Sequence, residues 1–180
     1  MALGDSLTQG WYNGGRNTHP YSIALQRCVD TSGASRYTIE TAGVPGETSG
    51  ELVVRAEGLA KAGRYEAVVV LSGTNDIGEA TSAQIVANLQ QIYAHFERAG
   101  SKLVLVTVPD SSHQIDWVIQ KRNEVNAAIR AYCAAKAHTL VDLSAQLPYS
   151  REYWDDALHL NPTGYDRMGE LIFAQLKELI

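Results

Sequence analysis

Short runs of β-branched and aliphatic residues alternate with longer segments of helical periodicity, and this alternation constrains the fold more than any other feature. The pattern is typical of an α/β domain with a parallel sheet and helices on both faces, a three-layer α/β/α sandwich. The expected strands are residues 2–3, 37–41, 67–71, 103–108 and 139–143. The expected helices are residues 21–29, 50–62, 82–99, 115–137 and 162–179.

Two of the expected strands, residues 67–71 and 103–108, are apolar except for Thr107, as strands covered on both faces should be. We expect them at the centre of the sheet. Ligands of open parallel sheets bind outside the carboxyl ends of the strands, so functional residues should lie in the loops that follow them. No repeat or Pro/Ser-rich linker interrupts the chain, which predicts a single domain over residues 1–180.

The composition argues against several classes of partner. Twenty Asp and Glu against fifteen Lys and Arg give a formal net charge of -5, and no basic stripe could follow a phosphate backbone. We therefore expect no nucleic acid partner. The apolar runs are only strand-sized, so we also expect no membrane span. No leader-like segment begins the sequence, which favours a cytoplasmic protein, with a leader already removed as the open alternative.

Several common motifs of α/β enzymes are missing. The sequence contains no G-x-G-x-x-G, G-x-x-x-x-G-K, H-E-x-x-H or C-x-x-C motif, and no G-x-S-x-G elbow. Nucleotide binding and zinc catalysis therefore lack sequence support.

A serine follows the first expected strand directly, in the block Gly4-Asp5-Ser6-Leu7. This position places the Ser6 hydroxyl at the carboxyl edge of the sheet, and Gly4 and Gly10 on either side allow unusual backbone angles. The arrangement favours an exposed and rigidly held nucleophile. Taken alone, the same block is also compatible with an ordinary turn and a helix-capping serine.

A serine nucleophile needs a base, and His159 is the histidine with a carboxylate at a suitable spacing. Asp156 lies three residues earlier, so one tight turn brings its carboxylate to a ring nitrogen. The other ring nitrogen is then free to take the serine proton. Asp155, four residues back, is expected to point to solvent or cap the turn. The remaining histidines are expected to cap, pack or be solvated: His19, His95, His113 and His138.

Two more loops offer hydrogen-bond donors for a negatively charged oxygen. Gly43 follows the second expected strand, where a backbone amide can approach a substrate with no side chain in the way. Asn75 follows the third expected strand and can offer its side-chain amide. Taken alone, these segments would be a glycine turn and an Asx-turn.

Together the blocks resemble the GDSL/SGNH hydrolase family, whose name records four residues in four separated blocks. Ser6, Gly43, Asn75 and His159 match these residues in order. The resemblance implies a flavodoxin-like fold with a parallel five-stranded sheet, hydrolysis of carboxylic esters or sometimes thioesters, and neither metal nor cofactor. It implies Ser6, Asp156 and His159 as the catalytic residues. It also implies an oxyanion hole made by the Ser6 amide, the Gly43 amide and the Asn75 side chain.

The sequence leaves the ester substrate open. No insertion is long enough for a lid, so we expect an open site for short acyl groups or for acetyl groups on a larger soluble carrier. The leading hypothesis is hydrolysis of short-chain or acetyl esters through an acyl-enzyme on Ser6. The alternatives are an acetyl esterase acting on carbohydrate, a thioesterase, a lysophospholipase or, less favoured, a non-catalytic flavodoxin-like binding domain. Aromatic residues expected near the rim could stack on a sugar or line an acyl pocket: Trp11, Tyr12, Trp117, Tyr149, Tyr153 and Trp154.

Overall fold

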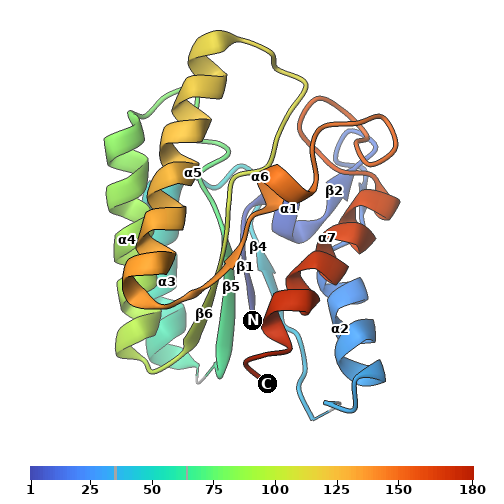
Figure 1. Ribbon diagram of the computed structural model, residues 1–180, viewed down its shortest axis with the longest axis vertical. Coiled ribbons are helices and arrows are strands. Elements are labelled where there is room, and N and C mark those ends of the chain that lie inside the picture. Colours follow the sequence, from blue (N-terminus) through green and yellow to red (C-terminus); the bar gives the residue numbers. More distant parts are fainter. Residues whose placement is uncertain (35, 64) are drawn as a thin grey trace.

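The computed structural model describes residues 1–34, 36–63 and 65–180, and a five-stranded sheet lies at its centre (Figure 1). Every neighbouring pair of strands is parallel. In order across the sheet the strands are β4 (Thr41–Gly43), β1 (Ala2–Gly4), β5 (Ala67–Leu71), β6 (Lys102–Val106) and β7 (Thr139–Val141). β5 and β6 occupy inner positions, as their apolar sequences predict.

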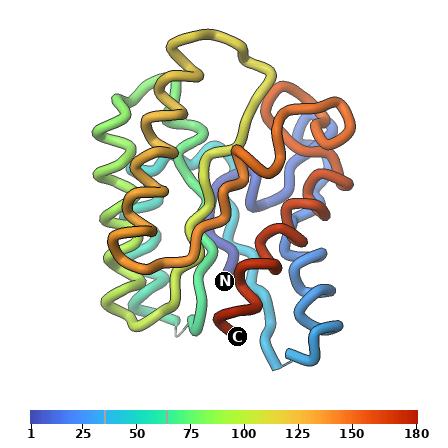
Figure 2. The backbone as a smooth tube through the Cα atoms, viewed as in Figure 1, coloured from blue at the N-terminus to red at the C-terminus, as the bar shows by residue number. Residues whose placement is uncertain are grey.

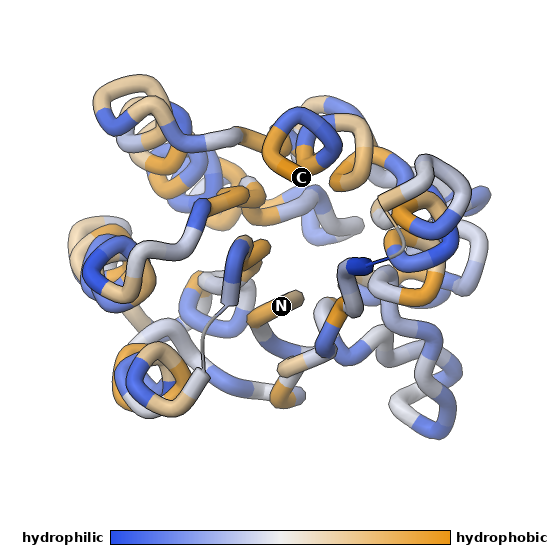
Figure 3. The backbone as a smooth tube through the Cα atoms, turned by 90° about the horizontal axis from the view of Figure 1, so that it is seen from below, coloured by the Kyte–Doolittle hydropathy of each residue, from blue (hydrophilic) through white to orange (hydrophobic). Residues whose placement is uncertain are grey.

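Helices cover both faces of this sheet. One face packs against α3 (Ser49–Ala62), α4 (Ser82–Arg98) and α5 (Asp116–Lys136). The other packs against α2 (Ser22–Thr31) and α7 (Pro162–Leu176). Figure 3, seen from below, shows the helices arranged around the central strands. The predicted three-layer α/β/α sandwich is therefore confirmed.

The pleat of the strands gives each helical layer an apolar surface. Along β5, Val68 and Val70 pack towards α3, α4 and α5, whereas Val69 and Leu71 pack towards α2 and α7. All four side chains are at most 3% exposed. Each such burial stabilises the fold by about 1.5–3 kcal/mol, and a strand buried on both faces carries an uninterrupted apolar sequence.

The start of α7 is fixed by a polar cap. Asn161 Oδ1 accepts a hydrogen bond of 2.9 Å from the Gly164 amide, and Pro162 occupies the first turn, where its missing donor costs little. Because α7 begins here, the cap also fixes the end of the loop that carries His159.

The expected second strand is wrong in its position. Residues 37–41 were expected to form it, but β4 begins only at Thr41. β1 is only three residues long, and its residues pair with Thr41–Gly43. The preceding backbone is tied to α2 instead, because the Ile39 amide donates to the Gln26 side chain at 2.7 Å.

Several short elements escape the sequence patterns because they are too short to show a period. They are α1 (Ser6–Gln9), the antiparallel pair β2 (Trp11–Tyr12) and β3 (Asn17–Thr18), and α6 (Leu143–Gln146). In Figure 2 the segment with β2 and β3 (blue) lies beside the loop that precedes α7 (orange), and the Asn13 amide donates to Asp155 between them. The other predicted strands and helices end within three residues of their predicted bounds.

Candidate active site

The three residues expected to act together lie in contact at the carboxyl edge of the sheet. Ser6 Oγ is 3.0 Å from His159 Nε2, and His159 Nδ1 is 2.9 Å from Asp156 Oδ2. An ionised carboxylate can only accept a hydrogen bond, so Nδ1 carries the hydrogen and Nε2 is left to accept the serine proton. The hydroxyl, the imidazole and the carboxylate therefore form one hydrogen-bonded series.

A tight turn holds Asp156 against His159. Asp156 Oδ1 accepts hydrogen bonds from the amides of Leu158 at 2.7 Å and His159 at 2.6 Å, while Oδ2 faces the His159 ring. Burial alone would raise the pKa of Asp156, but these hydrogen bonds outweigh burial and hold the pKa below its ordinary value. Asp156 is consequently ionised at neutral pH.

Ser6 is held by the transition from strand to helix. It is the first residue of α1, which follows β1 after a single residue, Asp5. Asp5 caps α1 by accepting a 2.9 Å hydrogen bond from the Leu7 amide. The Ser6 amide has no acceptor within the helix, because the first helical positions lack one. The hydroxyl and the amide of Ser6 are thus both fixed at the sheet edge.

Asp5 is itself a buried carboxyl group, only 1% exposed. Burial raises its pKa to about 7, although the hydrogen bond from Leu7 and the nearby His159 ring favour the ionised form. Glu47 and Asp76 add to the upward shift of this pKa. The carboxyl group of Asp5, the residue before Ser6, therefore titrates near neutral pH.

Gly43 packs directly on α1. A Cβ atom at this position would lie 2.3 Å from the Gln9 nitrogen and 2.8 Å from the Asp5 oxygen, so a larger residue does not fit. Because the next amide, that of Val44, donates to Gly4 of β1, the Gly43 amide points away from β1. Among the described strands none lies on that side of β4.

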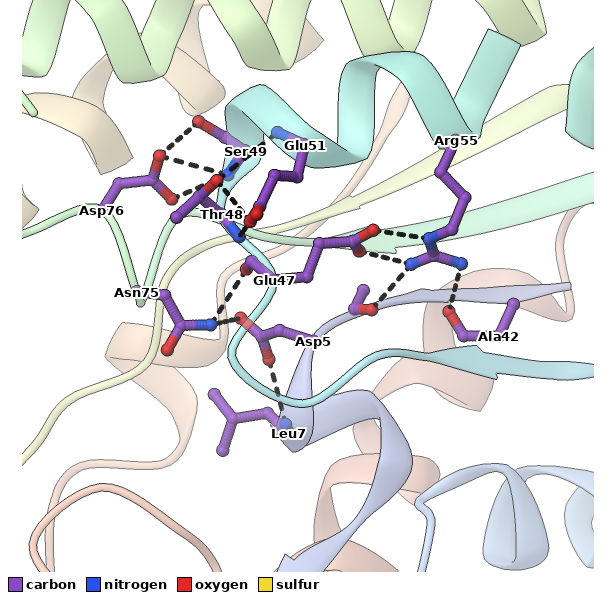
Figure 4. Close-up of polar contacts among 11 residues, drawn as sticks. Asp5, Leu7, Ala42, Glu47, Thr48, Ser49, Glu51, Arg55, Asn75 and Asp76 are labelled. Atoms are coloured by element: carbon purple, nitrogen blue, oxygen red, sulfur yellow. Dashed lines mark hydrogen bonds and ion pairs between the residues drawn. The ribbon is translucent and has the colours of Figure 1, made fainter. Parts of the chain in front are cut away.

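Asn75 lies in the loop after β5 and meets the Ser6 segment through Asp5 (Figure 4). Its Nδ2 donates to the Glu47 carbonyl at 2.9 Å and lies 3.5 Å from Asp5 Oδ2. The neighbouring Asp76, 3% exposed, accepts hydrogen bonds from the Ser49 amide at 2.9 Å and the Ser49 hydroxyl at 2.6 Å. The loop that carries Asn75 is thereby anchored to the start of α3.

No role was predicted from the sequence for the carboxylates of Asp5, Glu47 and Asp76. Asp5 and Asp76 directly adjoin Ser6 and Asn75, and this adjacency was the available signal. No such signal existed for Glu47, because a charged residue is usually exposed and its burial here depends on residues distant in the sequence.

A cavity of about 320 Å³ opens beside Asn75 and beside Leu158, the residue before His159. Its walls are mostly apolar. Trp117 lines this cavity and is 51% exposed. Other apolar lining residues are Ile77, Val108, Pro109 and Val118. Trp117 was expected near the rim, whereas the cavity itself was not predicted from the sequence.

On another side of His159 lies the segment that contains β2 and β3. The centroid of the Trp11 ring is 6.2 Å from that of His159. Two contacts hold the segment there: the Asn13 amide donates to Asp155 Oδ2 at 2.6 Å, and the Tyr165 hydroxyl donates to the Trp11 carbonyl at 2.7 Å. Trp11 is thus a second aromatic residue at the site, as expected.

The expectation of a rim position is wrong for Trp154. It is 5% exposed and belongs to the apolar core, because its backbone bridges to Leu160. Tyr149 and Tyr153 are partly buried against the same core.

Three of the other histidines have partners away from Ser6, and the fourth, His113, lines the cavity. His19 lies 2.8 Å from Asp166, His138 lies 2.7 Å from Glu97, and His95 contacts Arg98. Within residues 1–34, 36–63 and 65–180 no group of three or more His, Cys, Asp or Glu side chains could hold a metal ion. No helix of the same residues is long and apolar enough to cross a membrane.

A hydroxyl, an imidazole and a carboxylate in series at the edge of a parallel sheet form the arrangement of a serine hydrolase. The sequence pattern of the GDSL-like Lipase/Acylhydrolase family matches residues 2–167. The chain belongs to this family of carboxylic ester hydrolases. No curated protein sequence matches the chain.

Solved structures share the fold over nearly the whole chain. A lipase/acylhydrolase from Enterococcus faecalis has 23% sequence identity and a TM-score of 0.81, covering 98% of this chain and 94% of its own. An acetyl xylan esterase has 21% identity and a TM-score of 0.79, covering 96% of both chains. TesA has 21% identity and a TM-score of 0.83, covering 99% of this chain and 98% of its own. These matches show the SGNH hydrolase fold.

Proposed function

We propose that the protein hydrolyses short-chain carboxylic esters, including acetyl esters, through an acyl-enzyme on Ser6. The observation that carries this proposal is the series of contacts from Ser6 through His159 to Asp156, at 3.0 and 2.9 Å. His159 Nε2 takes the Ser6 proton while the Ser6 oxygen attacks the ester carbonyl. The imidazolium then protonates the leaving alcohol. Water repeats both steps on the acyl-enzyme and releases the acid.

Asp156 acts on His159 in this scheme. Its carboxylate keeps the hydrogen on Nδ1, which leaves Nε2 as the base, and it stabilises the imidazolium that forms. The lowered pKa of Asp156 supports this role, because a protonated carboxyl group would not stabilise the positive ring.

Three groups serve as donors to the oxyanion in the proposed scheme: the Ser6 amide, the Gly43 amide and the Asn75 side chain. The Asn75 hydrogen that faces Asp5 is only weakly engaged, since 3.5 Å is at the limit of a hydrogen bond. It is therefore the hydrogen that a developing oxyanion can take. A donor of this kind contributes about 3–4 kcal/mol to stabilising the transition state.

The cavity beside Asn75 supports a short acyl group. Its volume of about 320 Å³ is near the lower end of ligand pockets, which span roughly 300–1,000 Å³. Its apolar walls suit a hydrocarbon chain, and Trp117, the largest of the lining side chains, is the residue expected to limit the length of that chain.

A panel of 4-nitrophenyl esters with acyl chains of increasing length tests the proposal. We expect kcat/KM to be highest at about two to six acyl carbons and the Ser6→Ala variant to be inactive. Trp117→Ala should move the optimum to longer chains, whereas Val54→Ala, at a 73% exposed position on α3, should not. An acyl-CoA and a lysophospholipid in the same panel test the thioesterase and lysophospholipase alternatives. Preference for either of these, or for long-chain esters, would contradict the proposal.

A second candidate is an esterase that removes acetyl groups from carbohydrate. Trp11, with its ring near His159, supports it, because sugars stack on aromatic rings. One of the similar structures is an acetyl xylan esterase. In this case Trp11→Leu should raise KM for an acetylated oligosaccharide more than for 4-nitrophenyl acetate. Equal changes in both KM values would contradict sugar stacking.

A further inference from the structure

An ion pair between Glu47 and Arg55 lies near Asp5 and Asn75 (Figure 4). Arg55 on α3 donates from Nε and Nη2 to the carboxylate of Glu47, at 2.6 and 2.5 Å. The two side chains are 24% and 7% exposed. A buried ion pair is weak evidence for stability, because the cost of removing both charges from water can exceed their attraction. The contribution of this partly buried pair to folding is therefore small, and its contacts with the backbone bear on its role.

The guanidinium of Arg55 also reaches the ends of two strands. Nη2 donates to the Gly4 carbonyl and Nη1 to the Ala42 carbonyl, both at 3.1 Å. Gly4 lies two residues before Ser6, and Ala42 directly precedes Gly43. The same planar group thus holds the backbone that leads into two of the three donors.

Glu47 extends the contacts to the third donor. Its carboxylate is held by Arg55, and its backbone carbonyl accepts the 2.9 Å hydrogen bond from Asn75 Nδ2. A displacement of Glu47 would therefore move the acceptor that orients the Asn75 amide.

We propose that the Glu47–Arg55 pair is a positioning pair for the oxyanion hole, which sets the places of the Ser6 and Gly43 amides and the Asn75 side chain relative to one another. This inference rests on the proposed function. A guanidinium presents its donors in a rigid planar fork and reaches three acceptor groups at once, which the point charge of a lysine does not. Donors to an oxyanion act mainly in the transition state, so their displacement lowers kcat and changes KM little.

The first test compares Arg55→Lys and Glu47→Gln with a matched control. Arg130 on α5 makes a similar two-pronged contact with Asp142, at 2.8 and 2.7 Å, and its third side-chain contact is with Ser144. We expect Arg55→Lys and Glu47→Gln to lower kcat about tenfold or more with KM within about twofold. Arg130→Lys should leave kcat within about twofold. Circular dichroism and thermal unfolding report the folded fraction of each variant.

Unchanged kcat in both pair variants would overturn the inference. So would a loss that only follows the folded fraction, or one confined to KM. If Arg55→Lys does not fold, Glu47→Gln, which keeps the shape of the side chain, carries the same prediction.

A double-mutant cycle tests the route through Asn75. If Arg55 acts partly through this residue, Arg55→Lys should cost less in an Asn75→Ala background than in the wild type. The same fold-loss in both backgrounds would overturn that route.

One readout does not depend on catalysis. The NMR signal of the Asn75 side-chain amide, assigned with Asn75→Ala, should shift in Arg55→Lys and stay in place in Arg130→Lys. An unshifted signal in Arg55→Lys would overturn the inference even if the protein is an active esterase. Conversely, a wild type that hydrolyses no ester would refute the proposed function, whereas the NMR result would still decide whether the pair positions Asn75.

Discussion

The two halves of the site are held in different ways. Around Ser6, the carboxyl groups of Asp5, Glu47 and Asp76 belong to residues at most 8% exposed, and their loops are joined by contacts between distant parts of the chain. In the half that carries His159, the hydrogen bonds that hold Asp156 join residues two or three positions apart, and the side chain of Asp156 is 41% exposed. The buried half is held by contacts between distant loops, whereas Asp156 is held against His159 by local contacts.

This difference separates activity from folding. A substitution in the buried half should disturb the polar contacts between loops and therefore affect stability as well as catalysis. A substitution in the turn should affect catalysis alone, because water can solvate the groups left without a partner. Measuring kcat and the free energy of unfolding for the same variants can test this contrast.

The largest expected effect is at the point where the two halves meet. Ser6→Ala removes the hydroxyl but keeps the start of α1, so the protein should stay folded by circular dichroism while ester hydrolysis falls to background. A phosphonate or a sulfonyl fluoride should label Ser6 in the wild type and nothing in the variant. Labelling of Ser72 or Ser112 would place the nucleophile elsewhere.

Asn75→Ala should lower kcat by roughly a hundredfold, with a smaller change in KM, because the donor acts mainly in the transition state. As a member of the buried half it should also lower stability, by about 1 kcal/mol for the lost hydrogen bond to Glu47. Asn88→Ala, which removes the 3.0 Å bond to the Ser49 hydroxyl, is the control and should leave kcat within about twofold. An effect of Asn75→Ala on KM alone would mean that Asn75 binds the substrate before reaction and does not stabilise the transition state.

Asp156→Asn should lower kcat at least about tenfold and leave the unfolding temperature nearly unchanged, because the turn is local and partly exposed. An asparagine can present its amide nitrogen to the ring and favour the wrong tautomer. Steady-state kinetics and thermal unfolding of the same samples check both parts. A large loss of stability would mean that the turn supports the fold after all.

Asp5→Asn tests the electrostatics of the buried half. The pKa of Asp5 is raised to about 7, so between roughly pH 4 and pH 7 the folded wild type holds a proton that the unfolded chain has lost. Wild-type stability should therefore fall across this window as the pH rises. The variant does not titrate at this position, so as the pH rises its unfolding free energy should increase relative to that of the wild type.

Urea unfolding at about pH 5 and pH 8 measures the change, and each unit of pKa shift corresponds to about 1.4 kcal/mol. The pKa of Asp5 also depends on the nearby groups of Glu47, Asp76 and His159. Wild type and Asp5→Asn should therefore be compared at the same salt concentration. A difference between the two proteins that does not change with pH would contradict a raised pKa.

The sequence predicted the elements that carry their own pattern. β5 is apolar throughout because both of its faces are covered, so its position in the sheet could be inferred from one segment. Ser6, Gly43 and Asn75 could be located because they lie at or shortly after the ends of strands, and the carboxyl ends of parallel strands meet at one edge. Asp156 could be paired with His159 because the contact spans only three residues.

Features that depend on partners far along the chain could not be predicted. The bounds of β4 follow from the length of β1, which no local pattern of residues 37–41 reveals. Glu47 and Arg55 look like surface charges in the sequence, because it is the fold that brings them to the ends of β1 and β4. Trp154 looked like a rim residue until its bridge to Leu160 placed it in the core.

The smallest expected effect is that of Asp155→Asn, which tests whether the local turn uses one carboxylate or two. Asp155 is exposed, and its carboxylate accepts from the Asn13 amide, whereas the ring contact is made by Asp156. An asparagine retains an oxygen that can accept from Asn13, so kcat should change less than about threefold, within the usual range of surface substitutions. Kinetics of Asp155→Asn and Asp156→Asn side by side, with folding checked by circular dichroism, measure the contrast. If Asp155→Asn lowered kcat more than Asp156→Asn, the carboxylate that orients His159 would have to be that of Asp155. The turn that carries His159 would then depend on the hydrogen bond from the Asn13 amide to Asp155.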